Sequence, residues 1–255
     1  MLTKITRLLL LIVLVLNFSS CKNEDNPTEP NQQSNTTNPT GQPIPNFANQ
    51  KDVNGVMAAI RYSQISIVGF PAVETDIAFA MLGNGVDAGS VSLNGTSLGK
   101  INQGGKILYM VPDPSNPMQF LSLSWNGSNH SWNVSGGNGI PSLTGSVKSP
   151  NDFSIIQPSA NSAISKANGI QIKWSNTSST SKILVQITGV NSSQSKFYEE
   201  LADNGSYTIP TLDLSSFNGD CMLFVVRYTY NNTTSGGKKY YFVSEIVKSV
   251  NIKVN

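Results

Sequence analysis

The chain has few of the side chains on which most catalytic and metal sites depend. Its 255 residues include one histidine and two cysteines, and only 13% are charged, about half the share found in an average soluble domain. Zinc sites and nucleophilic triads both draw on histidine, and a disulfide scaffold needs several cysteine pairs. We therefore expect a protein that is not an enzyme and that has no cofactor and no metal site.

An excess of charge of one sign is also missing. The chain has 17 basic and 15 acidic residues. Two of the basic residues, Lys4 and Arg7, lie in an N-terminal segment that we expect to be removed, so the mature chain would carry 15 of each sign. Binding to nucleic acid depends on neutralising phosphates with Lys and Arg. A nucleic-acid partner is therefore not expected.

The N-terminus has the features of a targeting signal. Its apolar run, Leu8 to Leu16, has nine residues, too few for a bilayer core that needs about 20. Together with the preceding basic residues, this run is typical of a secretory signal. The ending Phe18-Ser19-Ser20-Cys21 resembles a bacterial lipoprotein signal. That resemblance implies that residues 1–20 are removed and that a lipid on Cys21 anchors the chain in a membrane. Ordinary secretion, which leaves Cys21 as a thiol, is the alternative.

The residues after the cysteine bear on location. Lys22 is followed by Glu24 and Asp25, which resembles the export signal of surface lipoproteins in Bacteroidota-type bacteria. The resemblance implies a lipid-anchored protein on the outer membrane that faces the cell exterior. A solvated charge cluster opening a linker is the alternative. Residues 21–47 are rich in Asn, Pro, Thr and Gln and should form a disordered tether, because they cannot bury enough apolar surface to fold.

The rest of the chain predicts an all-β fold. After Gly55, apolar residues recur with a period of two, in runs that Gly, Asn and Pro interrupt about every ten residues. We expect two β-sandwich-like domains, 48–148 and 150–255. The clearest hairpin is Val91 to Leu98, where Asn94-Gly95 suits a type I′ turn. Further strands are predicted at Val56–Tyr62, Asp76–Leu82, Lys106–Val111 and Met118–Trp125.

The second half carries a family resemblance. Pro158 is followed by strand patterns at Gly169–Trp174, Lys182–Thr188, Gly205–Pro210 and Cys221–Tyr230. This order resembles a fibronectin type III or related immunoglobulin-like β-sandwich over residues 150–255, and it implies that Trp174 is the core tryptophan. Cys221 and Met222 depart from the family, which usually has a buried tyrosine there. We expect the Cys221 thiol to be buried and inert.

The residues around one predicted turn form a candidate ligand site. A turn over residues 126–129 would place Trp125 opposite His130. A flat aromatic ring beside amide and imidazole groups can stack on a sugar and bond its hydroxyls. The candidate site comprises Trp125, Asn126, Asn129, His130 and Asn133. An ordinary turn, with His130 as a cross-strand partner, is the alternative. A second candidate surface is the predicted loop 230–237 with Tyr240 and Tyr241, which could equally be a hairpin connection.

Paired carboxylates are the one catalytic option left. Glu74 and Asp76 are two apart on a predicted strand, so they would lie on one face roughly 7 Å apart, within the range that glycosidases use. Solvated charges explain them equally well. We expect a non-catalytic binding or adhesion role toward a glycan or an envelope protein. The alternatives are a structural or assembly part of an envelope complex and, less favoured, a carboxylate-dependent carbohydrate-active enzyme, because sandwich folds host many functions.

Overall fold

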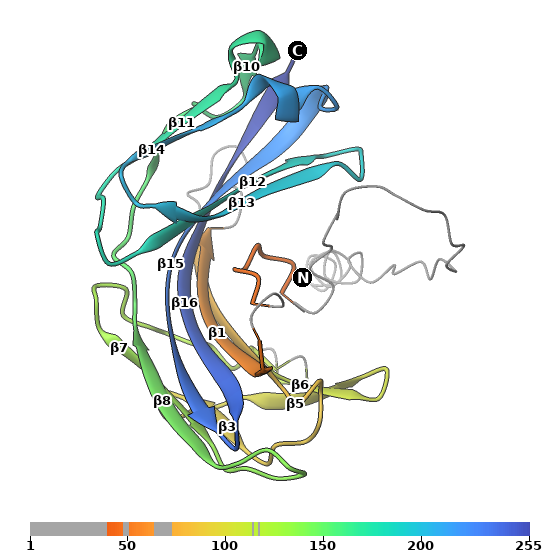
Figure 1. Cartoon of the computed structure of the whole chain (residues 1–255), viewed down its shortest axis with the longest axis vertical. Coiled ribbons are helices and arrows are strands. Elements are labelled where there is room, and N and C mark those ends of the chain that lie inside the picture. The colour runs from red at the N-terminus through yellow and green to blue at the C-terminus, as the bar shows by residue number, and fades with distance from the viewer. Residues whose placement is uncertain (1–39, 48–50, 64–72, 114, 117) are drawn as a thin grey trace, which may run out of the picture. The chain divides into compact units, whose positions relative to one another are not determined.

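The computed structural model describes residues 40–47, 51–63, 73–113, 115–116 and 118–255. Nearly all of its regular structure is β (Figure 1). The elements are β1 Val53–Ser63, β2 Glu74–Leu82, β3 Val91–Leu93, β4 Thr96–Ser97, β5 Gly99–Gln103, β6 Lys106–Val111, β7 Asn129–Val134, β8 Leu143–Lys148, β9 Ile155–Gln157, β10 Ser162–Ile164, η2 Lys166–Asn168, β11 Ile170–Trp174, β12 Lys182–Gly189, β13 Ser195–Ala202, β14 Ser206–Ile209, η3 Thr211–Leu214, β15 Gly219–Ser235 and β16 Lys238–Val254. Among the described residues, no helix has the length and hydropathy needed to cross a bilayer.

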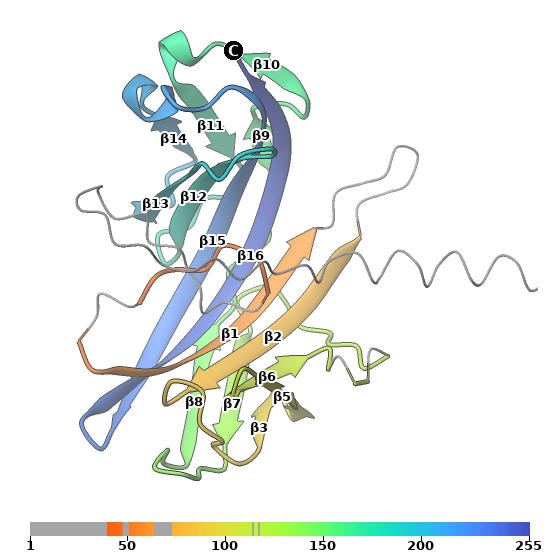
Figure 2. The same cartoon turned by 90° about the vertical axis from the view of Figure 1, so that its right-hand side faces the viewer.

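A long hairpin joins the two halves of the chain. Strands β15 and β16 have 17 residues each and belong to a nine-stranded sheet with the order β13-β12-β15-β16-β1-β2-β6-β5, to which β10 adds by pairing with β16. Strand β12 pairs with the first part of β15, whereas β1 runs parallel to the first part of β16. The hairpin therefore carries strands of the C-terminal half at one end and of the N-terminal half at the other (Figures 1 and 2).

The C-terminal half is an immunoglobulin-like β-sandwich. Strands β9, β11 and β14 form one sheet, in the order β14-β11-β9, and β12, β13, β15 and β16 form the β13-β12-β15-β16 part of the large sheet. Apolar residues of both sheets, such as Ile172 and Val185, meet in one core. Trp174 lies in this core at 3% exposure, as the family pattern predicts, and its Nε1 donates to Asp203 Oδ1 at 2.6 Å. The Cys221 thiol is free and buried.

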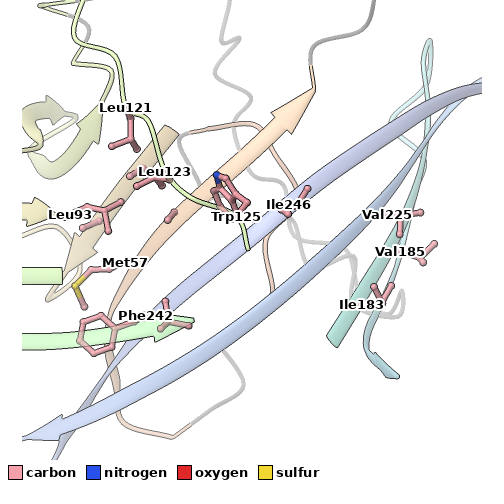
Figure 3. Packing of buried hydrophobic residues seen from close by; sticks show 14 of the residues in the cluster. Met57, Leu93, Leu121, Leu123, Trp125, Ile183, Val185, Val225, Phe242 and Ile246 are labelled. Carbon is pink, nitrogen blue, oxygen red and sulfur yellow. The ribbon is translucent and has the colours of Figure 1, made fainter. Parts of the chain in front are cut away.

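The N-terminal half repeats this layering with a different strand order. A four-stranded sheet, β4-β3-β7-β8, covers the far end of the large sheet. Gly145 on β8 permits the close approach, because a Cβ there would lie 2.2 Å from the Phe242 ring. The side chains of Thr229 and Asn231 on β15 donate to the carbonyls of Lys148 and Ser146, which satisfies the edge of β8. Both halves share one apolar cluster along the hairpin (Figure 3).

The local predictions agree with the structure better than the longer-range ones. Asn94 and Gly95 adopt positive φ angles of 48° and 82° in the predicted hairpin, and Ser92 pairs with Ser97. The predicted strand Met118–Trp125 differs: beyond one bridge from Leu121 to Asp76, the described residues of this segment pair with no strand. The predicted loop 230–237 is also different, because residues up to Ser235 continue β15.

Two of the predicted segment boundaries can be compared with the burial of the residues around them. Residues 40–47 fall within the predicted tether, yet Ile44 and Phe47 are buried against the large sheet, because this short stretch contains the apolar residues that the tether otherwise lacks. Ser149 and Pro150, at the predicted domain boundary, are buried as well. The signal peptide and the motif of Cys21, Lys22, Glu24 and Asp25 lie outside the described residues, so lipidation and export stay predictions.

Candidate binding surfaces

Trp125 and His130 meet as the sequence predicts, but inside the protein. Their ring centroids lie 4.8 Å apart in an edge-to-face arrangement, with exposures of 6% and 0%. His130 Nε2 donates to the Ser124 carbonyl at 3.1 Å, and its Nδ1 accepts from the Ser244 hydroxyl at 2.9 Å. Burial lowers the pKa of His130, which favours the neutral ring. A sugar therefore has no access to the Trp125 face, and both imidazole nitrogens are already bonded.

The acids considered for catalysis are held in ion pairs. Asp76 is buried and bonds Arg61 Nε at 2.8 Å, the backbone N–H of Leu123 at 2.7 Å and Trp125 Nε1 at 3.0 Å. Arg61 also lies over the Trp125 ring, 5.4 Å from its centroid. Glu74 pairs with Arg61 at 3.3 Å and with Lys248 at 2.7 Å. Through these contacts, Asp76 holds the segment that includes Leu123 and Trp125 in place before β7, and Glu74 pairs with the same arginine. This is a structural role.

The three asparagines of the predicted site are exposed, but they do not share one surface with Trp125. Asn126 lies in the turn before β7, while Asn129 and Asn133 are on β7. Asn133 is the member that lines a depression, a trough of about 670 Å³ on the outer face of the four-stranded sheet. The structure therefore separates the predicted site into a buried aromatic pair and a polar outer surface.

The outer surface is a grid of small polar side chains. One row across strands β3, β7 and β8 consists of Ser92, Asn133 and Thr144, which are register neighbours. Next to it, Ser131 is paired with Ser146, and Asn94 bonds the Ser131 backbone in both directions at 2.8 Å. Neighbouring strands lie about 4.8 Å apart and same-face residues about 7 Å apart. The grid thus offers hydroxyl and amide groups at regular spacing over a flat area.

The sequence contains a signal for this grid. Small polar residues alternate with apolar ones on each of the three strands: Ser92 and Asn94 flank Leu93, Ser131 and Asn133 flank Trp132, and Thr144 and Ser146 flank Gly145. Period-two alternation shows that the polar residues face outward together. What the sequence does not show is that β3, β7 and β8 are neighbours, because β3 and β7 are separated by more than 30 residues.

A second depression lies on the C-terminal sandwich. A trough of about 920 Å³ runs between β9 and β10 and over the outer face of β11. Gln171, Lys173 and Thr208 provide polar groups there, and Ile156, which is 60% exposed, provides an apolar one. Among the described residues, no group of three or more His, Cys, Asp or Glu side chains is arranged to hold a metal ion.

Two fully buried sites with ionisable side chains lie on opposite faces of the hairpin. Inside the C-terminal sandwich, Arg227 Nε is 2.7 Å from Asp203 Oδ2, and both side chains have no exposure. On the other face, Glu245 is also buried, and neither of its carboxyl oxygens has a hydrogen-bond partner. Burial raises the pKa of Glu245 well above its usual value. Sequence patterning gave no reason to single out either site.

Comparisons with known proteins add little. No family model matches the chain, and no curated protein matches it. Among solved structures, the chain is similar to one described as "Crystal structure of chicken CNTN1 FN1-FN3 domains", with a TM-score of 0.22 and 8% identity. The match covers 68% of this chain and 62% of the other, so this chain spans less than two thirds of that one. Similarity this low carries no argument about function.

Proposed function

We propose that the protein is a lipid-anchored, non-catalytic binding protein of the bacterial outer surface that captures glycans through the polar grid on β3, β7 and β8. The observation that supports this role is the trough of about 670 Å³, which is lined by six hydroxyl and amide side chains and whose one bulky lining residue, Trp132, is only 2% exposed. Such groups both donate and accept hydrogen bonds, as sugar hydroxyls require. The strands that carry them are paired with one another, so less backbone order has to be gained on binding.

The flatness of the grid sets the expected strength of binding. A hydrogen bond exchanged with water contributes about 0.5–1.5 kcal/mol net, and no aromatic ring lies open in this trough to add stacking energy. A single site would therefore bind a short glycan weakly. Many copies anchored on one surface would hold a long polysaccharide by avidity, because each further contact is intramolecular. This arrangement suits adhesion or glycan capture.

Affinity electrophoresis tests the grid. The full chain, solubilised in a polyoxyethylene detergent that carries no sugar, is run through gels containing a panel of soluble polysaccharides. We expect retardation in at least one gel, and we expect the double variant N133A/T144A to lose it. Gln171→Ala is the matched control, because it removes an exposed strand side chain from the other trough. Retardation that disappears in the control and persists in the double variant would move the site to the C-terminal sandwich.

Metabolic labelling with a palmitate analogue tests the anchor. We expect label in the wild-type chain and none in Cys21→Ala. Cys221→Ala is the control, because the Cys221 thiol is buried and should not affect lipidation. Protease shaving of intact cells then tests the location. Accessible wild-type protein, and protection after Lys22, Glu24 and Asp25 are replaced by Ala, would support export to the outer face, whereas protection of the wild type would place it inside.

A further inference from the structure

The concave face of the large sheet carries an aromatic platform, which consists of Tyr228, Tyr230 and Tyr241 on the hairpin β15–β16. The centroids of Tyr228 and Tyr230 are 6.3 Å apart with nearly parallel rings, and those of Tyr230 and Tyr241 are 6.1 Å apart. Tyr230 is 39% exposed, whereas Tyr241 is 4% exposed. The platform is unusual for the outer face of a sandwich sheet, because this face carries a second apolar cluster separate from the main core.

Residues 43–47 of the same chain occupy this platform. Phe47 stacks on Tyr241, with centroids 4.3 Å apart, and meets Tyr230 edge to face at 5.4 Å. Pro43, Ile44 and Pro45 are also buried. The backbone N–H of Asn46 donates to Glu199 Oε2 at 2.7 Å. Figure 2 shows this segment, which precedes β1, crossing the hairpin.

The chemistry of the contact matches a known mode of peptide recognition. Prolines fix the backbone in an extended form, so little conformational entropy is lost when such a segment docks on aromatic rings. The sequence Pro43-Ile44-Pro45-Asn46-Phe47 supplies two prolines, two apolar anchors and one N–H for an acid. Ile44 and Phe47 pack into the second apolar cluster, the Asn46 N–H bonds Glu199, and the segment adds no strand to the sheet.

We propose that the tyrosine platform is a docking site for an extended, proline-containing peptide segment of a partner protein, and that residues 43–47 are its intramolecular occupant. A partner segment that presents an apolar residue between prolines, followed by an aromatic residue, makes the same contacts. The intramolecular segment competes at an effective concentration near millimolar, because only a short connection joins it to β1. Docking of the partner releases residues 40–47 and lengthens the chain before β1 by up to about 26 Å. This role is separate from glycan capture on the grid.

A fluorescent peptide with the sequence of residues 41–47 tests the proposal against the full chain. In Phe47→Ala the platform is intact but its occupant is weakened, so we expect the peptide to bind at least tenfold more tightly than to the wild type. Adding Tyr230→Ala, which removes an exposed ring, should reverse that gain. Asn46→Pro, which lacks the N–H that bonds Glu199, is a second way to weaken the occupant without altering the sheet.

The controls separate this proposal from its rivals. A scrambled peptide should not bind any of these variants, and circular dichroism should show each variant folded. Equal binding to wild type and to both weakened variants, or equal binding of the scrambled peptide, would overturn the proposal. Light scattering tests whether a second copy of the chain supplies the docked segment. A wild-type dimer that dissociates in Phe47→Ala would show that it does, and this result would also overturn the proposal. Polysaccharide retardation should be unchanged in Phe47→Ala whichever result is found.

Discussion

The two faces of the hairpin differ in the hydrogen bonds of their buried ionisable side chains. The inner face points into the C-terminal sandwich, and the concave face carries the tyrosine platform. On the inner face, Asp203 accepts from Arg227 Nη2 at 3.1 Å, from Trp174 Nε1 at 2.6 Å and from the backbone N–H of Ser178 at 3.1 Å. Arg227 also donates to the carbonyls of Asn151 and Ser175. On the concave face, Glu245 lies beside the register partners Tyr228 and Ile60 with no hydrogen bond to either oxygen.

The difference shows where the fold is fixed and where it can change. A buried charge is tolerated when it is paired and hydrogen-bonded, and such a set specifies one arrangement of the segments that contribute to it. Here those segments include the connection through Asn151 that leads from one half to the other. An unpaired carboxyl is tolerated only in its neutral form. We therefore expect the inner site to dominate stability and the concave site to make stability depend on pH.

The largest effect should come from Asp203→Ala. This change leaves the Arg227 guanidinium buried without its carboxylate and the Trp174 indole without its acceptor. Breaking a buried pair from one side typically costs 3–5 kcal/mol, so about that loss is expected. Urea unfolding measures it. The exposed Asp220→Ala should stay within about 0.5 kcal/mol of wild type. A loss below 1 kcal/mol in Asp203→Ala would show that the inner site does not fix the fold.

Glu245→Gln should remove a pH dependence. Because the pKa of Glu245 is raised in the folded state, the folded protein holds this proton more tightly than the unfolded chain does. The contribution to stability is complete below about pH 4.5, and it is lost as the pH rises from there through the folded pKa. Relative to wild type, the variant should become progressively more stable across that interval. Parallel curves of unfolding free energy against pH for the two proteins would contradict the neutral-carboxyl interpretation.

His130 should give the opposite slope. Burial lowers its pKa below the ordinary 6.5, so the unfolded chain takes up a proton first as the pH falls. Stability is complete above about 6.5 and is lost as the pH falls toward the folded pKa. The chain has one histidine, so any imidazole slope belongs to this residue. In His130→Gln the difference in unfolding free energy from wild type should shrink as the pH falls from 7 to 5, and a constant difference would refute this account.

Sequence reasoning succeeded where the determining contacts are local. The hairpin at Asn94-Gly95 follows from two residues that tolerate positive φ, and the Trp174 strand follows from alternation over five residues. The exposed or buried state of Trp125 could not be predicted in this way. Its burial depends on Arg61 and Asp76, which lie about 50 or more residues earlier in the chain and reach it through the sheet.

Dependence on distant contacts also explains why the sequence did not predict the buried residues of the concave face. Composition correctly describes most of residues 21–47 as poor in apolar side chains, but it averages over the few, Ile44 and Phe47, that find a platform on strands almost 200 residues away. Glu245 likewise follows Ser244 in a strand whose sequence gives no warning that Tyr228 and Ile60 become its buried neighbours. The burial of these residues depends on pairing between strands that are distant in the chain. Such pairing cannot be read from a single sequence.

The smallest loss of stability should come from replacing a partly exposed acid, Glu74. Glu74 pairs with Arg61 and Lys248, but its side chain is 38% exposed, so water screens the pair and Glu74→Gln should cost at most about 1 kcal/mol. Asp76→Asn should cost more, because the carboxylate accepts from the Leu123 backbone and the Trp125 indole inside the protein. Urea unfolding of both variants at low and high salt separates the two. Only the Glu74 effect should shrink with salt, and a salt-insensitive loss above 2 kcal/mol in Glu74→Gln would place that acid with Asp203 among the groups that fix the fold.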